Sequence, residues 1–170
     1  MHSEYSKKLS NKQLIDKHHS LLMLDSQFEA FFDAVTSLTA KLCHSPVALV
    51  TFIEDDSIWI QSQIGFPDTK MLPNKKKVSA IFPKENDYFE VSHSAMDKML
   101  KKHLFLIENQ KTEFYAGAHI RLPLGEMVGV LCVFDNKPRR LTAMQRTYLV
   151  GMAKVIEKAL VTRNFVKRVS

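Results

Sequence analysis

The sequence predicts an α+β domain. We expect a central, mostly antiparallel five- to six-stranded sheet, with the N- and C-terminal helices on one face and an irregular segment with a short helix on the other. Two segments, beginning at Ser26 and at Thr142, repeat apolar residues at intervals of three and four, as amphipathic helices do. Between them lie apolar or alternating runs, chiefly residues 47–64 and 114–135, which are typical of strands.

The composition indicates one domain of an ordinary globular kind. The chain has 170 residues, and we expect a domain over residues 26–168, preceded by an N-terminal helical extension over residues 1–25. No apolar run approaches the roughly 18 residues of a membrane span, and the first residues lack a signal-peptide core. We therefore predict a cytoplasmic protein without a membrane partner.

Charge and cysteine usage narrow the function classes further. The formal net charge is +6, which gives a generic attraction to anions. Since no recognition helix or set of stacking aromatics accompanies it, nucleic acid is not expected as a partner. Cys43 and Cys132 form no CxxC pair, so neither a metal site nor a structural disulfide is predicted.

The first core helix is predicted from its capping signals and its apolar stripe. Ser26 and Glu29 have capping-box spacing, and Pro46 ends the helical pattern. The stripe that should face the sheet consists of Phe28, Phe31, Phe32, Val35, Leu38 and Leu42.

Two strands are expected next. Residues 47–53 are continuously apolar and rich in β-branched side chains, which indicates a strand buried on both faces. Residues 58–64 alternate, so one face should carry Ile58, Ile60 and Ile64 and the other Trp59, Gln61 and Gln63.

The middle of the chain, residues 66–90, carries three prolines and has no sustained period. We expect a long excursion here, of the kind that often forms a lid or a binding loop. A short helix over residues 95–102 and a short strand over residues 103–107 should follow it.

Residues 114–135 hold three of the five glycines in the chain. The two halves, FYAGAHIRL and EMVGVLCVF, predict a hairpin that turns at Pro123-Leu124-Gly125. Gly117 and Gly129 lie inside the strands, where glycine marks the close approach of another group. The sequence leaves open whether that group is a helix packed on the sheet or a bound ligand.

The last helix should begin after a capping box formed by Thr142 and Gln145 and extend to about residue 165. Its apolar seam consists of Leu149, Met152, Ala153, Ile156 and Leu160. Other apolar residues point outward on the terminal helices, and they predict a homodimer through Tyr148, Val155 and Leu14, Leu21 or Leu22.

Three stretches carry a family resemblance. They are DAVTSLTAKLCHSPVALVTFIEDD, then SIWIQSQIGF, and finally FYAGAHIRLPLGEMVGVLCVFDNKPRRLTAMQ, which is the most specific of the three. Together they resemble GAF domains, the small-molecule sensory and regulatory modules of bacterial-type signalling proteins. The resemblance implies a ligand held between the sheet and the middle excursion.

By this resemblance and by alternation along the strand, the candidate pocket residues are Trp59, Phe82, His93, Met96, Tyr115, His119 and Arg121. The residues alone also allow Trp59 and Phe82 to fill core. Where many relatives carry a Phe-Cys-x-His segment, this chain reads YFEVSHSAM. Without that cysteine no bilin thioether link is expected, and no cofactor is predicted.

Three classes of function remain open. The first is a sensory or regulatory domain that binds an unidentified ligand, or is degenerate without one, and signals to a possible separate output protein. The second is a protein-interaction module with an empty pocket. The third resembles the free methionine sulfoxide reductases, which need reactive cysteines. Neither Cys43 nor Cys132 has neighbours that would depress its pKa, so no enzymatic activity is predicted.

Overall fold

The computed structural model describes residues 26–54, 57–65, 71–72, 86–91 and 112–169. The elements in chain order are α2 (Ser26–Leu42), β1 (Val47–Glu54), β2 (Ser57–Ile64), β3 (Met71–Leu72), β4 (Tyr88–Val91), β5 (Phe114–Arg121), β6 (Met127–Asp135) and α4 (Ala143–Val169).

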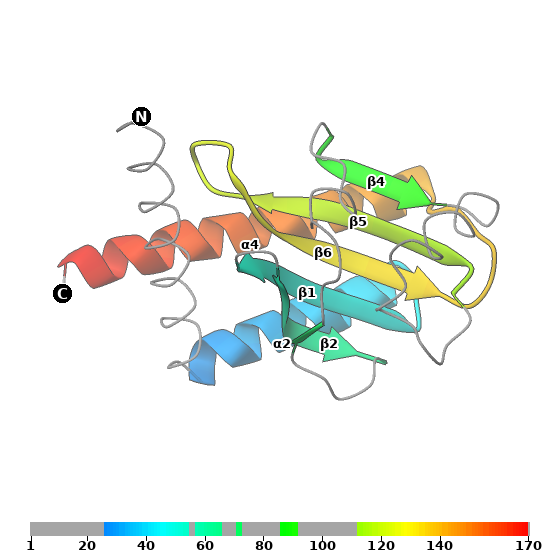
Figure 1. Ribbon diagram of the computed structural model, residues 1–170, viewed down its shortest axis with the longest axis horizontal. Helices are drawn as coiled ribbons and strands as arrows, with labels where there is room; N and C mark the ends of the chain where they lie inside the picture. The colour runs from blue at the N-terminus through cyan, green and yellow to red at the C-terminus, as the bar shows by residue number, and fades with distance from the viewer. Residues whose placement is uncertain (1–25, 55–56, 66–70, 73–85, 92–111, 170) are drawn as a thin grey trace.

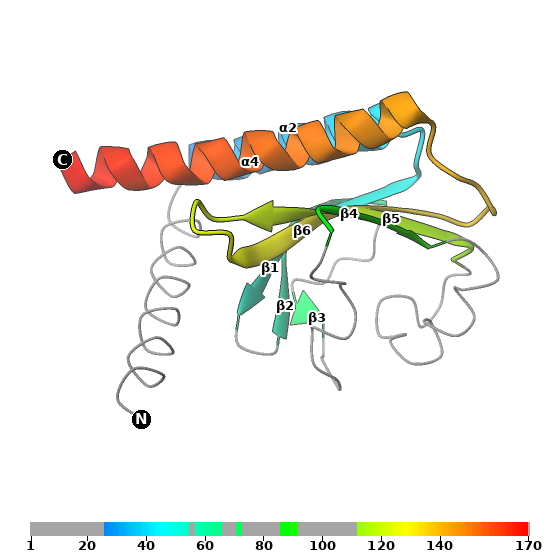
Figure 2. The same ribbon diagram turned by 90° about the horizontal axis from the view of Figure 1, so that it is seen from above.

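The strands form a six-stranded sheet in the order β3-β2-β1-β6-β5-β4, and every pair is antiparallel. Helices α2 and α4 run side by side over one face of this sheet (Figures 1 and 2). The predicted fold class is thereby confirmed, including the shared face of the two helices. The segment expected on the other face, with its helix over residues 95–102 and strand over residues 103–107, lies outside the described residues.

The core lies between the helices and the sheet. Phe32 of α2 and Leu149 and Ile156 of α4 are fully buried there. The sequence prediction is wrong at Leu38, which is 44% exposed, because Thr36 and Thr39 occupy the buried side of α2 instead. Their hydroxyls donate to the carbonyls of the preceding turn, at 2.8 and 2.7 Å, so that burial leaves no polar group unmatched.

A bulge in the β1–β2 pair overturns the alternation expected of β2. Val50 pairs with Ser62, but the next residue, Thr51, pairs with Ile60. The extra residue transfers the remainder of β2 to the opposite face. Ile60 and Ile64 therefore point to different faces, although the sequence pattern assigned them to the same one.

The edge strand β4 was missed by the sequence reading, which treated residues 66–90 as irregular. Its four residues are too few to show a period. Tyr88 and Glu90 face the helices, where the Tyr88 hydroxyl donates to Glu90 Oε2 at 2.6 Å. The other carboxylate oxygen of Glu90 accepts the Leu141 N–H at 3.1 Å, just before α4 begins. The opposite face of β4 carries Phe89 and Val91.

Helix α4 begins with the capping box predicted from the sequence. Gln145 Oε1 accepts the Thr142 N–H at 3.0 Å, and Thr142 Oγ1 accepts the Gln145 N–H at 3.1 Å. The predicted seam of α4 packs against the sheet through Leu149, Met152, Ala153, Ile156 and Leu160.

Replacing Thr142 by alanine should lower the free energy of unfolding by about 1 kcal/mol, because one end of this reciprocal cap is lost. Thr142 is exposed, so its packing contributes little. Urea unfolding would measure the change. Thr147→Ala is the matched control on the same helix, since its hydroxyl only bonds the Ala143 carbonyl within the helix. Equal losses in the two variants would contradict the capping role.

Candidate functional site

The face of the sheet opposite the helices carries the candidate site. Tyr115, Gly117 and His119 alternate onto this face along β5. Their partners across β6 are Phe134, Cys132 and Val130. We call this face of β4, β5 and β6 the far face.

Gly117 leaves room for the ring of Phe89, which extends from the neighbouring strand β4. A Cβ at this position would lie 2.3 Å from the Phe89 ring and 2.9 Å from Val130. At Gly129, a Cβ would lie 2.2 Å from the backbone oxygen of Thr51 on β1. Both explanations offered by the sequence, a packed helix and a bound ligand, are therefore wrong. The close neighbours belong to adjacent strands of the same sheet.

Tyr115 and His119 are deeply buried, at 5% and 2% exposure. The Phe89 ring contacts both of them, with centroid distances of 5.0 Å to Tyr115 and 5.5 Å to His119. On its other side Tyr115 stacks on Phe134 at 4.7 Å. The result is a compact aromatic group that spans three strands.

Two polar atoms in this group have no hydrogen-bond partner in the structure as described: the Tyr115 hydroxyl and His119 Nε2. Leaving a buried polar atom unmatched costs about 1–3 kcal/mol, so native proteins rarely keep two of them close together. An arrangement of this kind fits a ligand that supplies the missing partners.

Both of these side chains are neutral near pH 7. Burial raises the pKa of Tyr115 well above its usual value. Burial, followed by the nearby Arg121 guanidinium, lowers the pKa of His119, and the Asn86 backbone and Asp87 only partly oppose this. Tyr115 and His119 thus offer hydrogen-bonding groups without charge.

Arg121 lies at the end of β5, beyond a register shift that follows Ile120. Its Nε contacts Asp87 Oδ1 at 2.9 Å and its Nη1 donates to the Gly125 carbonyl at 3.1 Å. Nη2 lies 3.5 Å from His119 Nδ1. The structure thus places the Arg121 guanidinium beside His119, and the Phe89 ring links His119 to Tyr115.

Trp59 does not join them. It pairs with Phe52, whose ring contacts Phe32 of α2 at 5.7 Å, so this pair lies on the helix side of the sheet. The bulge in β2 explains the difference from the sequence expectation. Phe82, His93 and Met96 lie outside the described residues.

The sequence reading missed Phe89 and Phe134. Phe134 had a usable signal, because it directly faces Tyr115 once the hairpin register is drawn from its turn. Phe89 had only the four-residue alternation YFEV, which is too short to be recognised on its own.

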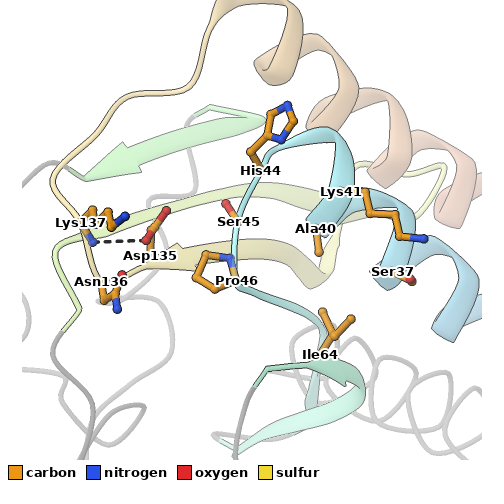
Figure 3. Close-up of a pocket in the computed structure, with 10 residues that line it drawn as sticks. All are labelled: Ser37, Ala40, Lys41, His44, Ser45, Pro46, Ile64, Asp135, Asn136 and Lys137. Carbon is orange, nitrogen blue, oxygen red and sulfur yellow. Dashed lines mark hydrogen bonds between the residues drawn. The ribbon is translucent and has the colours of Figure 1, made fainter.

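A shallow groove of about 850 Å³ lies at the C-terminal end of α2 (Figure 3). It is lined by Ser37, Ala40, Lys41, His44, Ser45, Pro46, Ile64, Asp135, Asn136 and Lys137. Asp135, its only carboxylate, is paired with Arg139 at 3.0 Å. The carboxylate in this lining is therefore held in an ion pair, and Lys41 and Lys137 supply cationic side chains beside it.

The same end of α2 closes with a Schellman turn. His44 adopts φ 48°, and the Ser45 and His44 N–H groups bond the Ala40 and Lys41 carbonyls at 3.0 and 3.2 Å. Two further carbonyls, of Cys43 and His44, accept hydrogen bonds from Arg139 at 2.6 and 2.7 Å. A cation thus caps the negative end of the helix.

Both thiols are buried. Burial raises the pKa of Cys43 to about 11, although Arg139 opposes the shift, and burial also raises that of Cys132. Both are protonated near neutral pH and are poor nucleophiles. Within the described ranges, no group of three or more His, Cys, Asp or Glu side chains could hold a metal ion. No helix in those ranges has the length and apolar character needed to cross a membrane.

An antiparallel six-stranded sheet with its first and last helices on one face is the architecture of GAF domains. The chain is similar to the GAF domain of PixJ from Thermosynechococcus elongatus, in its blue-light-absorbing form. That match has a TM-score of 0.63 and 12% identity, over 83% of this chain and 89% of the other. The GAF domain of an Acinetobacter phosphoenolpyruvate-protein phosphotransferase matches with a TM-score of 0.67 and 12% identity, over 94% and 96%. The chain has the GAF fold.

Sequence comparison adds a relative of known activity. No protein-family model matches the chain. A cyclic di-GMP phosphodiesterase of Pseudomonas aeruginosa is 24% identical over 117 residues, which is 69% of this chain. The match spans only about a fifth of that relative's length, at 20%.

Proposed function

We propose that this chain is a sensory or regulatory domain of a signalling protein, and that it binds a small ligand on the far face. The observation that carries the proposal is the pair of buried, unmatched polar atoms on Tyr115 and His119. The ligand would accept or donate one hydrogen bond to each and lie against the Phe89 ring. Because both groups are neutral, an uncharged polar edge suits the site.

The remaining parts of the proposal concern the role of the domain, its extent and its partners. The GAF fold is shared with PixJ and with a phosphotransferase domain, which supports a regulatory role. We assign the domain to residues 26–168 and residues 1–25 to a helical extension, in a bacterial-type cytoplasmic protein. Phe82, His93 and Met96 are proposed as further ligand contacts. The domain would act through association of its terminal helices and a separate output protein.

Tyr115→Phe tests the site directly. The variant deletes only the unmatched hydroxyl, so the ligand-free protein should become more stable, with a Tm a few degrees higher. Thermal unfolding measures the change. Tyr88→Phe is the matched control: it deletes a hydroxyl that is bonded to Glu90, and it should lower the Tm. A loss of stability in Tyr115→Phe equal to that in Tyr88→Phe would contradict an unmatched hydroxyl.

The ligand is sought by native mass spectrometry of the purified chain and by thermal shift with nucleobases, nucleosides and cyclic nucleotides. A compound that binds the native state raises the Tm, and Tyr115→Phe should reduce that rise. No co-purifying mass and no shift with any compound would favour the second candidate, an interaction module with an empty pocket.

The reductase alternative rests on the fold alone, and the buried, protonated thiols argue against it. Turnover of free methionine sulfoxide by the native chain, abolished in a Cys43→Ala/Cys132→Ala variant, would restore it.

A further inference from the structure

The groove at the C-terminal end of α2 carries two lysines that pair with no carboxylate of the described residues. Lys41 lies in the last turn of α2, and Lys137 lies in the loop between β6 and α4. The acidic residue of the groove, Asp135, is bound instead by Arg139, at 3.0 Å. The described lining of the groove therefore has a surplus of positive charge.

The end of α2 does not cancel this charge. A helix C-terminus is normally negative, so it would repel an anion and attract a nearby lysine. Here four carbonyls at this end already accept hydrogen bonds, two from backbone N–H groups and two from the Arg139 guanidinium. Because these bonds satisfy the helix end, the Lys41 ammonium is left available to another anion.

The two cations are separated by an apolar surface. Figure 3 shows Lys41 on one side of Pro46 and Lys137 on the other. Pro46 and Ile64 also line the groove, and the Ile64 side chain is 40% exposed. A compact anion placed at one of the lysines would leave the other lysine and Ile64 uncovered. A peptide with several acidic residues could reach both cations and cover the apolar surface between them.

We propose that this groove binds an acidic peptide segment of the separate output protein, whose existence rests on the proposed function. Carboxylates of the segment pair with Lys41 and Lys137, and an apolar side chain of the segment packs on Ile64. Sites for small molecules are concave and enclose most of the ligand, whereas this groove is shallow. The bound segment would contact both the end of α2 and the loop that leads into α4 (Figure 1).

Nuclear magnetic resonance of the isotope-labelled full chain, titrated with the hexapeptide EDLEDL, measures the binding. At about 50 mM salt, where charges are weakly screened, the Kd should be about 1 mM or lower. The amide shifts should concentrate at residues 37–46, 64–65 and 135–137. The uncharged peptide QNLQNL should bind at least about ten-fold more weakly, because its amides replace the carboxylates. Shifts centred on another surface, or equal binding of the two peptides, would overturn the proposal.

Lysine variants test the two cations. Lys41→Gln and Lys137→Gln should each weaken EDLEDL binding by about three-fold, and the double variant by about ten-fold, as expected for exposed ion pairs. Both side chains are exposed, so the variants should fold like the native chain. Lys158→Gln is the matched control, because it removes the same charge from an exposed position on α4 outside the groove. Equal weakening in the three single variants would show attraction to net charge alone and overturn the proposal.

Citrate distinguishes a peptide from a small anion. It should bind more weakly than EDLEDL, and equal or tighter binding of citrate at the same amides would overturn a peptide as the occupant. Tyr115→Phe should bind EDLEDL like the native chain, since Tyr115 lies on the far face. A chain that does not bind the peptide therefore removes this inference alone. Conversely, failure of the far-face site leaves the groove titration intact.

Discussion

Replacing Arg139 by alanine should lower the free energy of unfolding by about 3–5 kcal/mol. The guanidinium bonds the Cys43 and His44 carbonyls and the Asp135 carboxylate, and it lies 5.4 Å from the Phe114 ring centroid. Alanine would leave Asp135, with its side chain only 9% exposed, without its cation. Breaking a buried pair from one side has a cost of this size because the remaining charge stays desolvated. Chemical denaturation measures the loss.

Two further variants separate charge from geometry at this position. Arg139→Lys keeps the charge but cannot reach several acceptors with a planar fork, so its loss should be intermediate. Arg140→Ala removes the adjacent, exposed arginine and should change stability by less than about 0.5 kcal/mol. If Arg139→Ala and Arg140→Ala were equally stable, Arg139 would have no capping role.

Replacing Gly129 by alanine should destabilise the domain by about 3 kcal/mol or prevent folding. The added Cβ would lie 2.2 Å from the Thr51 oxygen and 3.0 Å from the Phe52 ring. Overpacking of a core side chain costs about 1–3 kcal/mol, and here the obstacle is backbone, which cannot rotate aside. The β1–β6 ladder would have to separate to accommodate the methyl group. Soluble yield and the urea midpoint report the effect.

Gly151→Ala is the matched control for Gly129→Ala, since the same methyl group is added in open space on α4. At low micromolar concentration this variant should gain up to about 1 kcal/mol, because alanine favours a helix interior over glycine. Similar losses in both glycine variants would contradict the steric explanation.

The sequence was most informative where a local rule acts alone. The α2–α4 face, the hairpin turn at Gly125 and the capping box at Thr142 were all predicted, because each depends on a few residues close in the chain. Apolar runs likewise located β1, and two apolar halves around a turn located β5 and β6.

The sequence-based prediction failed where the structure depends on how strands pair. The bulge after Val50 changes the face on which Trp59 lies. The alternation of residues 58–64 does not indicate that a bulge is present. Phe89 reaches the candidate site only because β4 pairs with β5, a contact made across the sheet. Alternation along the strand identified Tyr115 and His119. That their polar atoms have no hydrogen-bond partner depends on the three-dimensional arrangement and could not be predicted from the sequence.

The edge strand β4 makes contacts on both faces of the sheet, through Phe89 on the far face and Glu90 on the helix side. Phe89 touches Tyr115 and His119, while the next residue, Glu90, holds the Leu141 N–H and lies 3.7 Å from Arg146 on the first turn of α4. A shift of the β4 backbone that moves Phe89 would therefore also move the Glu90 carboxylate, which accepts a hydrogen bond from Leu141 just before α4. Strand β4 thus connects the far face of the sheet to the start of the last helix.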